Sequence, residues 1–247
     1  MRAPRGRAAA ALASVLAAAA PGAAQAGWGP TAPVAPIPFA DRLTGEPPRV
    51  AIDRNGDAVT AWVGTADDGS PILQVAVRPA GGRFGGPAQL SGSGQASAPA
   101  VAMGAGGDAV VAWLENGAVR AAARRPGGPF SPAVSLTAPA GAMEQLDGPE
   151  LAVTGDGRAI AVWTRGRGTR AGLQVTSYTP GAGWTAPITL SAAGELASEP
   201  AVAVDEAGDA VVAWRQATAG GRGLVRAAIG AISRPTATGA TARAFFA

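Results

Sequence analysis

The chain of 247 residues contains no cysteine, no histidine and no lysine, and only 5% of its residues are aromatic. Without cysteine it forms no disulfide bonds, so its stability must come from packing and strand pairing. Without histidine or cysteine it cannot hold a Ser-His-Asp or Cys-His triad, a histidine-ligated metal or a histidine pH switch. Hydrolytic chemistry would have to rest on carboxylates, with or without the single tyrosine, Tyr178.

The first 26 residues have the order of a secretory signal. Arg2, Arg5 and Arg7 precede an uncharged Ala/Val/Leu-rich run over residues 8–20, and Ala24-Gln25-Ala26 offers a small-x-small cleavage site. The run is too short for a membrane span. The sequence therefore predicts a signal peptide over 1–26 and a secreted or extracytoplasmic protein with no membrane span.

Removing this segment also removes the excess positive charge. The chain has 20 basic and 17 acidic residues, and without Arg2, Arg5 and Arg7 the basic count falls to 17. A chain with no net charge lacks the excess of basic residues with which proteins bind nucleic acid or an anionic membrane. We therefore expect no nucleic-acid partner.

Four tryptophans mark an internal repeat. They are 51, 50 and 51 residues apart, a proline stands fourteen residues before each of them, and a glycine recurs in the same register. The three sets are Trp62, Trp113, Trp163 and Trp214; Pro48, Pro99, Pro149 and Pro200; and Gly56, Gly107, Gly157 and Gly208. A repeat near 50 residues built of short strands is typical of propeller blades.

Each repeat reads as four short strands. An alternating run such as 200–205 leads through a glycine turn to an apolar run such as 209–214, and the glycine supplies the positive φ of the turn. Third runs follow at 72–78, 118–124, 173–178 and 224–229, and fourth runs at 87–91, 132–137 and 187–191. Because the second runs are apolar on both faces, the sheets must pack on one another. The sequence thus predicts an all-β propeller of about four four-stranded antiparallel blades, with repeats near 48–98, 99–148, 149–199 and 200–232.

The last repeat provides only three strands. Residues 36–40 resemble the fourth run at 187–191 and lie as far before Pro48 as Pro87 lies before Pro99. We therefore predict that an N-terminal strand within 34–40 completes the last blade, closes the ring and hides the sheet edges. An open or incomplete array is the alternative. Residues 233–247 lose the pattern and are expected to form a disordered tail.

This register of Pro, Gly-Asp-Ala and Trp resembles the β-propeller repeat proteins exported by high-GC bacteria, loosely grouped with sialidase-like Asp-box propellers. The resemblance covers residues 34–230 and implies a secreted propeller. The Asp-box motif, Ser-x-Asp-x-Gly-x-Thr-Trp, is absent, and no residue matches the arginine triad, the Tyr/Glu nucleophile pair or the acid Asp of sialidases. Tyr178 falls on a third strand without the sialidase context.

The repeated residues are interpreted as structural. Because the four tryptophans recur in register within buried strands, we expect them to pack between blades, although an aromatic sugar-binding surface is the alternative. The stretch Asp53–Asp57 (DRNGD) looks like the start of a calcium loop, but its counterparts keep one carboxylate each, which favours turn chemistry. Asp57, Asp108 and Asp209 are expected to bond turn amides, with no metal and no cofactor.

Function is expected on two sets of variable loops at one face of the scaffold. One set follows each Trp and the other joins each blade to the next. The candidate ligand-binding residues of the first set are Asp67, Asp68, Glu115, Arg165, Arg167, Arg170, Arg215 and Arg222. Glu144, Asp147 and Glu195 come from the second set.

These observations predict a non-enzymatic binding or scaffold module that takes a glycan or protein ligand at the cell exterior, with no catalytic residue assigned. A sialidase-like glycoside hydrolase using loop carboxylates is the first alternative, because glycosidases need two carboxyls across a cleft. A fragment of a longer propeller is the second.

Overall fold

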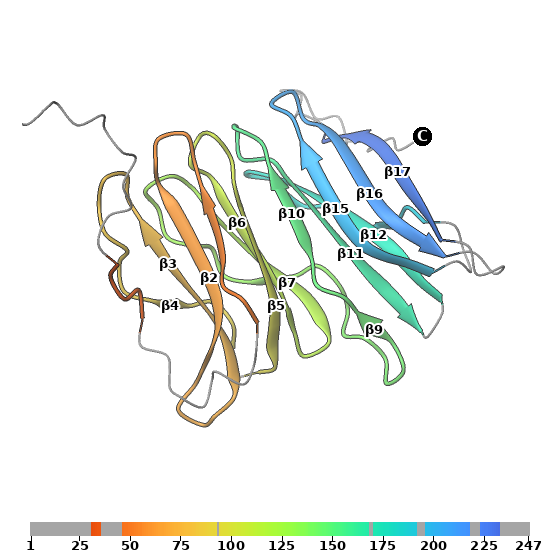
Figure 1. Cartoon of the computed structure of the whole chain (residues 1–247), viewed down its shortest axis with the longest axis horizontal. Helices are drawn as coiled ribbons and strands as arrows, with labels where there is room; N and C mark the ends of the chain where they lie inside the picture. The colour runs from red at the N-terminus through yellow and green to blue at the C-terminus, as the bar shows by residue number, and fades with distance from the viewer. Residues whose placement is uncertain are drawn as a thin grey trace, which may run out of the picture. The chain divides into compact units, whose positions relative to one another are not determined.

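The computed structural model describes residues 31–35, 46–92, 94–167, 170–191, 196–217 and 223–232. By its internal contacts the chain divides into Met1–Pro33 and Val34–Ala247, and every strand belongs to the second unit. Four antiparallel sheets follow one another along the chain, and Figure 1 shows them side by side in chain order. Each sheet is called a blade below.

The first two blades contain four strands each, paired in sequence order. Blade one comprises β1 (Arg49–Ile52), β2 (Ala58–Thr65), β3 (Pro71–Arg78) and β4 (Ala88–Gln89). Blade two comprises β5 (Ala96–Met103), β6 (Ala109–Glu115), β7 (Ala118–Arg124) and β8 (Val134–Ser135).

Blades three and four depart from this plan. Blade three comprises β9 (Gln145–Leu146), β10 (Glu150–Val153), β11 (Ala159–Arg167), β12 (Arg170–Thr179), β13 (Gly183–Trp184) and β14 (Ile188–Thr189). Its two additional short strands pair with the central hairpin, β9 with β11 and β13 with β12. Blade four comprises β15 (Leu196–Val204), β16 (Asp209–Ala217) and β17 (Gly223–Ala231).

The turn between the first two strands of each blade has the same backbone hydrogen bonds, but the side chain at its start differs. Asp53 Oδ1 accepts hydrogen bonds from the N–H groups of Asn55 and Asp57 at 2.8 and 2.9 Å, and Asp205 Oδ1 accepts from Gly208 and Asp209. In blade three the hydroxyl of Thr154 accepts from the N–H of Arg158 at 3.1 Å, and in blade two Gly104 has no side chain to do so. Of the aspartates expected to bond turn amides, Asp57 accepts the N–H of Ala80 in the turn after β3, at 2.6 Å. The DRNGD stretch forms a turn capped by Asp53.

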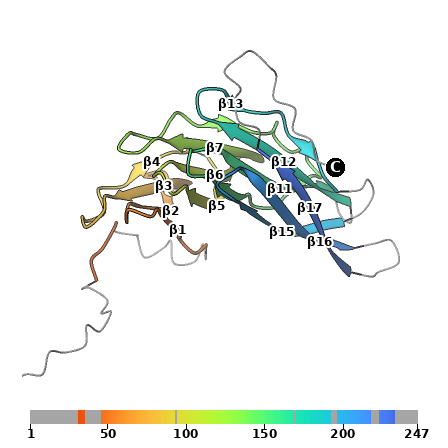
Figure 2. The same cartoon turned by 90° about the horizontal axis from the view of Figure 1, so that it is seen from above.

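Neighbouring blades pack face to face through one recurring interface. Figure 2 shows the same sheets from above, with the strands of each blade side by side. The face of blade one that carries Val59 and Leu73 packs on Trp113 of blade two in one apolar cluster. Blade two contacts Trp163 in the same way, and blade three contacts Trp214. All four repeat tryptophans are buried. Each blade thus offers an apolar face to the tryptophan-bearing face of the next.

The fourth strands are short because a hydroxyl replaces part of the strand pairing. Ser91, Thr137 and Ser191 follow the fourth strands, and their buried hydroxyl oxygens accept hydrogen bonds from the N–H groups of Leu73, Val119 and Leu173 in the third strands. The predicted fourth runs therefore pair with the third strands as expected, but only two residues of each run form a strand.

The predicted fold class is confirmed: the described residues form four stacked antiparallel sheets and no helix. No described helix is therefore long and apolar enough to cross a membrane. Residues 36–40 and the tail after Ile232 lie outside the described residues, so the closing strand stays a prediction. The first strands of blades two and four also begin earlier than expected, at Ala96 and Leu196.

Substituting a tryptophan between two blades should destabilise the stack. Trp113 is fully buried between blades one and two, so Trp113→Ala should lower the free energy of unfolding by about 3–5 kcal/mol. Urea denaturation followed by circular dichroism measures this change. Trp184→Ala is the comparison and should cost less, because Trp184 is only half-buried at the margin of the cluster between blades two and three, beside Tyr178 with ring centroids 5.2 Å apart. Equal losses in the free energy of unfolding for the two variants would contradict the role of Trp113 in packing blade one on blade two.

Candidate functional site

The first strands of the four blades, β1, β5, β10 and β15, contact one another along the inner edge of the stack. Where these strands begin, the surface is hollowed into a cavity of about 500 Å³, called the inner-edge pocket below. Its lining comes from all four blades and consists of Arg49, Ala98, Pro99, Asp147, Gly148, Pro149, Glu150, Ser198, Glu199 and Pro200. The pocket therefore lies at three of the four repeat prolines.

The backbone at the pocket is unusual on two sides. Ala98 and Glu199 precede prolines and have φ values of 49° and 50°, a region that non-glycine residues seldom adopt. Strand pairing shifts register at both places, between Ser97 and Ala100 and between Ser198 and Ala201. Such conformations cost about 1–3 kcal/mol and persist where the surrounding structure enforces them. Here the residues of both bulges line the pocket.

Neighbouring groups hold two of the pocket carboxylates. Asp147 Oδ2 accepts a hydrogen bond of 2.9 Å from the hydroxyl of Thr164, a buried residue of β11. The Glu199 carboxylate pairs with Arg215 at 3.1 Å, both side chains being 67% exposed. The positions of both carboxylates are thus set by strands of their own blade.

The lining carries three carboxylates, from Asp147, Glu150 and Glu199, and one guanidinium, from Arg49. Carboxylates accept hydrogen bonds and the guanidinium donates them, so the pocket can bind a ligand rich in hydroxyl groups. Over the described ranges, no three acidic side chains lie close enough to hold a metal ion.

Of the described loop residues predicted to bind ligand, Asp147 lines this pocket, whereas those of the first set lie at the same end of the sheets but do not line it. Arg215 comes nearest, through its pair with Glu199. Glu115 is buried and accepts hydrogen bonds from the indole N–H of Trp113 and the N–H of Gly92. Asp68 caps its own turn at Ser70, Asp67 is exposed, and Arg222 and Glu195 lie outside the described residues. Their roles as ligand contacts stay predictions.

Three of the predicted residues do come together on the connection from blade two to blade three. Arg165 Nη2 pairs with Glu144 Oε2 at 2.8 Å and donates to the carbonyl of Pro139, and Arg165 Nη1 donates to the carbonyl of Ala138. The N–H of Gly141 donates to Glu144 at 3.0 Å. These contacts, with Arg167 nearby, hold the pKa of Glu144 below its ordinary value.

Sequence reasoning named Asp147 but missed Arg49, Glu150 and Glu199 as pocket residues. The sequence feature that could have identified these residues is their position next to the repeat prolines. Arg49 and Glu150 occupy the position that is alanine in the other two repeats, at Ala100 and Ala201. A charged residue at an otherwise apolar repeat position marks the place where the strand end faces solvent.

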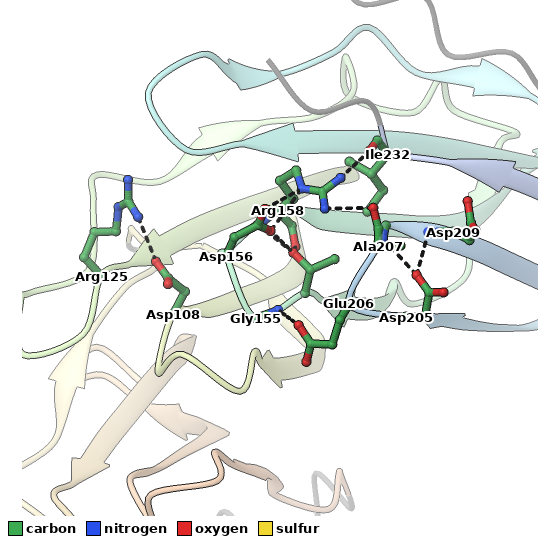
Figure 3. Close-up of polar contacts among 12 residues, drawn as sticks. Asp108, Arg125, Gly155, Asp156, Arg158, Asp205, Glu206, Ala207, Asp209 and Ile232 are labelled. Carbon is green, nitrogen blue, oxygen red and sulfur yellow. Dashed lines mark hydrogen bonds and ion pairs between the residues drawn. The ribbon is translucent and has the colours of Figure 1, made fainter. Parts of the chain in front are cut away.

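The opposite end of the sheets carries a structural network, shown in Figure 3. Arg158 stands where the other repeats have Asp, and its side chain is buried. It donates to the carbonyls of Ala207 and Ile232 in blade four, and its Nε pairs with Asp156 at 3.0 Å. Gly208, at φ +96°, gives Arg158 its space, because a Cβ there would lie 2.2 Å from Nη1. Arg158 thus fastens blade four to blade three.

A second cavity of about 390 Å³ opens at this turn end and includes Arg125, Phe130 and Tyr178 in its lining. Arg125 pairs there with Asp108 at 3.4 Å. Tyr178 therefore lies at the other end of β12 from the inner-edge pocket. A tyrosine nucleophile combined with the pocket carboxylates is not available in this structure.

No family model and no curated protein matches this chain. Among solved structures it is similar to the Hadza microbial sialidase Hz136, with 13% identity, a TM-score of 0.48, and coverage of 74% of this chain and 43% of the sialidase. It is also similar to the Penicillium chrysogenum α-L-arabinanase, with 12% identity, a TM-score of 0.47, and coverage of 76% and 62%. The endo-arabinase from Bacteroides thetaiotaomicron is 13% identical, with a TM-score of 0.42 and coverage of 76% of this chain and 75% of the arabinase. The chain spans less than two thirds of the first two proteins, and at these identities no activity is transferred.

Removing the side chain of Arg158 should loosen blade four. Arg158→Met leaves the carbonyls of Ala207 and Ile232 without this donor, and an unsatisfied buried polar group costs about 1–3 kcal/mol. We expect the free energy of unfolding, measured in urea, to fall by at least that amount. Arg125→Met is the control, since its exposed ion pair should contribute about 1 kcal/mol or less. A smaller loss for Arg158→Met than for Arg125→Met would contradict the role of Arg158.

The order of the loop that carries Glu144 should depend on pH. Because the folded-state pKa lies below the ordinary 4.5, ionised Glu144 stabilises the loop fully above pH 4.5 and loses this effect as the pH falls through the lowered pKa. Hydrogen exchange at the Gly141 amide should therefore be slower in the native protein than in Glu144→Gln at pH 7. The two should converge in acid. Equal exchange at pH 7 would show that the carboxylate does not order the loop.

Proposed function

We propose that this protein is an extracytoplasmic binding module that takes a carbohydrate at the inner-edge pocket. The observation that carries the proposal is the convergence of four charged side chains from three blades on one cavity of about 500 Å³: Arg49, Asp147, Glu150 and Glu199. That volume lies in the usual range of about 300–1,000 Å³ for ligand pockets. A lining of acceptors with one guanidinium suits a polyhydroxylated ligand.

The charge of the lining indicates the class of sugar. Three carboxylates outnumber Arg49, and Arg215 at the margin is already paired with Glu199. An anionic sugar would meet like charges, which disfavour binding. The ligand class is therefore neutral or amino sugars, and sialylated glycans should bind less well. The loop residues Arg165, Arg167 and Arg170 then form contacts beyond the pocket for the rest of a longer glycan or for a protein that carries it.

Glycoside hydrolysis is the second candidate function. Carboxylates reach the pocket from both blade three, with Asp147 and Glu150, and blade four, with Glu199. Glycosidases divide the roles of acid and base or nucleophile between two such groups. The binding module is preferred because Glu199 is held by Arg215 in an exposed ion pair rather than in the buried, apolar surroundings typical of a catalytic acid.

A glycan array followed by titration calorimetry tests the proposal. The protein should bind neutral or amino sugars, and Glu150→Gln or Glu199→Gln should weaken binding at least tenfold. Asp57→Asn is the matched control, because Asp57 lies at the turn end and accepts only a backbone N–H, from Ala80, among its described bonds. Weakening by Arg165→Ala with unchanged binding by Glu150→Gln would move the site to the loops and overturn the pocket assignment.

A panel of aryl glycosides separates the two candidate functions. The binding module predicts no turnover above that of the buffer. Turnover that is lost in both Glu150→Gln and Glu199→Gln, but kept in Asp57→Asn, would establish the hydrolase instead.

A further inference from the structure

The outer face of blade four is an exposed apolar surface. On β16 and β17 the paired residues Val211 and Ile229 point to this side, as do Ala213 and Ala227 and, one step further, Val225. Val211, Ile229 and Val225 are 45%, 71% and 80% exposed. With Ala201 and Ala203 of β15, which pair with Ala213 and Val211, these residues form what is called the end face below.

The end face has the chemistry of a blade interface. The same repeat positions in blade three are Ile160, Val162, Leu173 and Val175, and all four are at most 1% exposed because blade four covers them. Three blades bury this face against a tryptophan-bearing sheet. In blade four the face remains exposed, and exposed apolar patches of this kind mark interaction surfaces.

The tryptophan-bearing face of blade one is the one that a closed ring or a head-to-tail chain of copies would use. Its centre is covered, because Trp62, Ile72 and Ala76 are 6%, 3% and 1% exposed. At its β1 edge, Val50 and Ile52 pair with Thr60 and Ala58 on the same side of the sheet and are 68% and 62% exposed. A contact between the end face and blade one of another copy is therefore an outcome that the experiment below must separate.

We propose that two copies of this chain pack end face against end face about a two-fold axis. The charges on β16 support this partner and fix its direction. Asp209 and Arg215 are exposed and stand at opposite ends of the apolar row Val211–Ala213, on the same side of the sheet, and Arg215 also pairs with Glu199 of β15 at 3.1 Å within its own copy. A two-fold axis across the strands places Asp209 of each copy opposite Arg215 of the other. An axis along the strands would set like charges against each other, which is destabilising.

The size of the end face sets the strength of the contact. Strands of nine residues span ~30 Å, and three strands are ~14 Å wide, a footprint of ~400 Å² on each copy. Such a contact is small for a stable dimer, for which about 800 Å² on each partner is standard. The dimer should therefore dissociate on dilution, and sheet-on-sheet packing at an angle near −30° is its expected geometry.

Sedimentation velocity over a wide concentration range tests the dimer. The purified protein should show a concentration-dependent monomer–dimer equilibrium. The double variant Val225→Glu, Ile229→Glu should raise the dissociation constant at least tenfold. Val50→Glu is the matched control, because Val50 is an equally exposed valine, 68%, on blade one, and it should leave the equilibrium unchanged. Circular dichroism melts establish that each variant is folded.

Charge reversal tests the direction of the axis. Asp209→Arg and Arg215→Asp should each weaken the dimer, because each variant sets like charges of the two copies opposite each other when the two-fold axis runs across the strands. Arg215→Asp also breaks the pair with Glu199 of its own copy, so Asp209→Arg is the decisive variant. A protein that stays monomeric at every concentration would overturn the proposal. So would a dimer that is insensitive to the Val225 and Ile229 substitutions, longer head-to-tail oligomers, or a dimer that Asp209→Arg does not weaken.

Discussion

The packing of one apolar sheet face on the tryptophan-bearing face of the next sheet is the interaction on which the rest of this structure depends. The chain has no disulfide and few aromatic residues to stabilise individual blades. Each interface instead combines small and branched side chains, such as Ala161 and Val162, with one large buried indole. The many alanines allow the sheets to approach closely, and the tryptophan fills the space between them.

The polar contacts of the repeat tryptophans differ from blade to blade. The indole N–H of each repeat tryptophan finds a buried or half-buried acceptor, but the acceptor differs: Gln74 and Gln174 lie across the strand pair, whereas Glu115 and Gln216 lie two residues along the same strand. Close approach of the turns likewise explains glycines outside the repeat register. A Cβ at Gly104 would lie 1.9 Å from the carbonyl oxygen of Thr154 in the next turn.

Sequence reasoning succeeded where a feature recurs and failed where a repeat departs from its neighbours. The strands, the glycine turns and the stacking of the sheets follow from a register kept four times. Arg158 could not be assigned in the same way, because it replaces the Asp of the other repeats and its carbonyl partners belong to blade four. Glu199 could not be assigned either, because its repeat position holds a different residue in every repeat and its partner Arg215 comes from another strand. The candidate closing strand shows the same limit. It carries Ala40 where the other blades carry Ser91, Thr137 and Ser191, whose hydroxyls bond the third strand.

The site follows from the packing. Because the blades stack with their first strands in contact, the four strand beginnings meet, and charged residues beside the repeat prolines gather there without any recognisable motif. The pocket is thus built on the ends of rigid elements, and the loops around it vary without disturbing the core. Its chemistry is set by two or three substitutions at repeat positions.

A double-mutant cycle across one interface tests the central claim most directly. Leu173 of blade three and Trp214 of blade four belong to the same buried cluster. If the two side chains stabilise each other, Leu173→Ala and Trp214→Phe should be non-additive in the free energy of unfolding, with a coupling of about 0.5–3 kcal/mol. The pair Leu73→Ala and Trp214→Phe joins two different clusters and should be additive. Additivity in the first cycle would contradict the account.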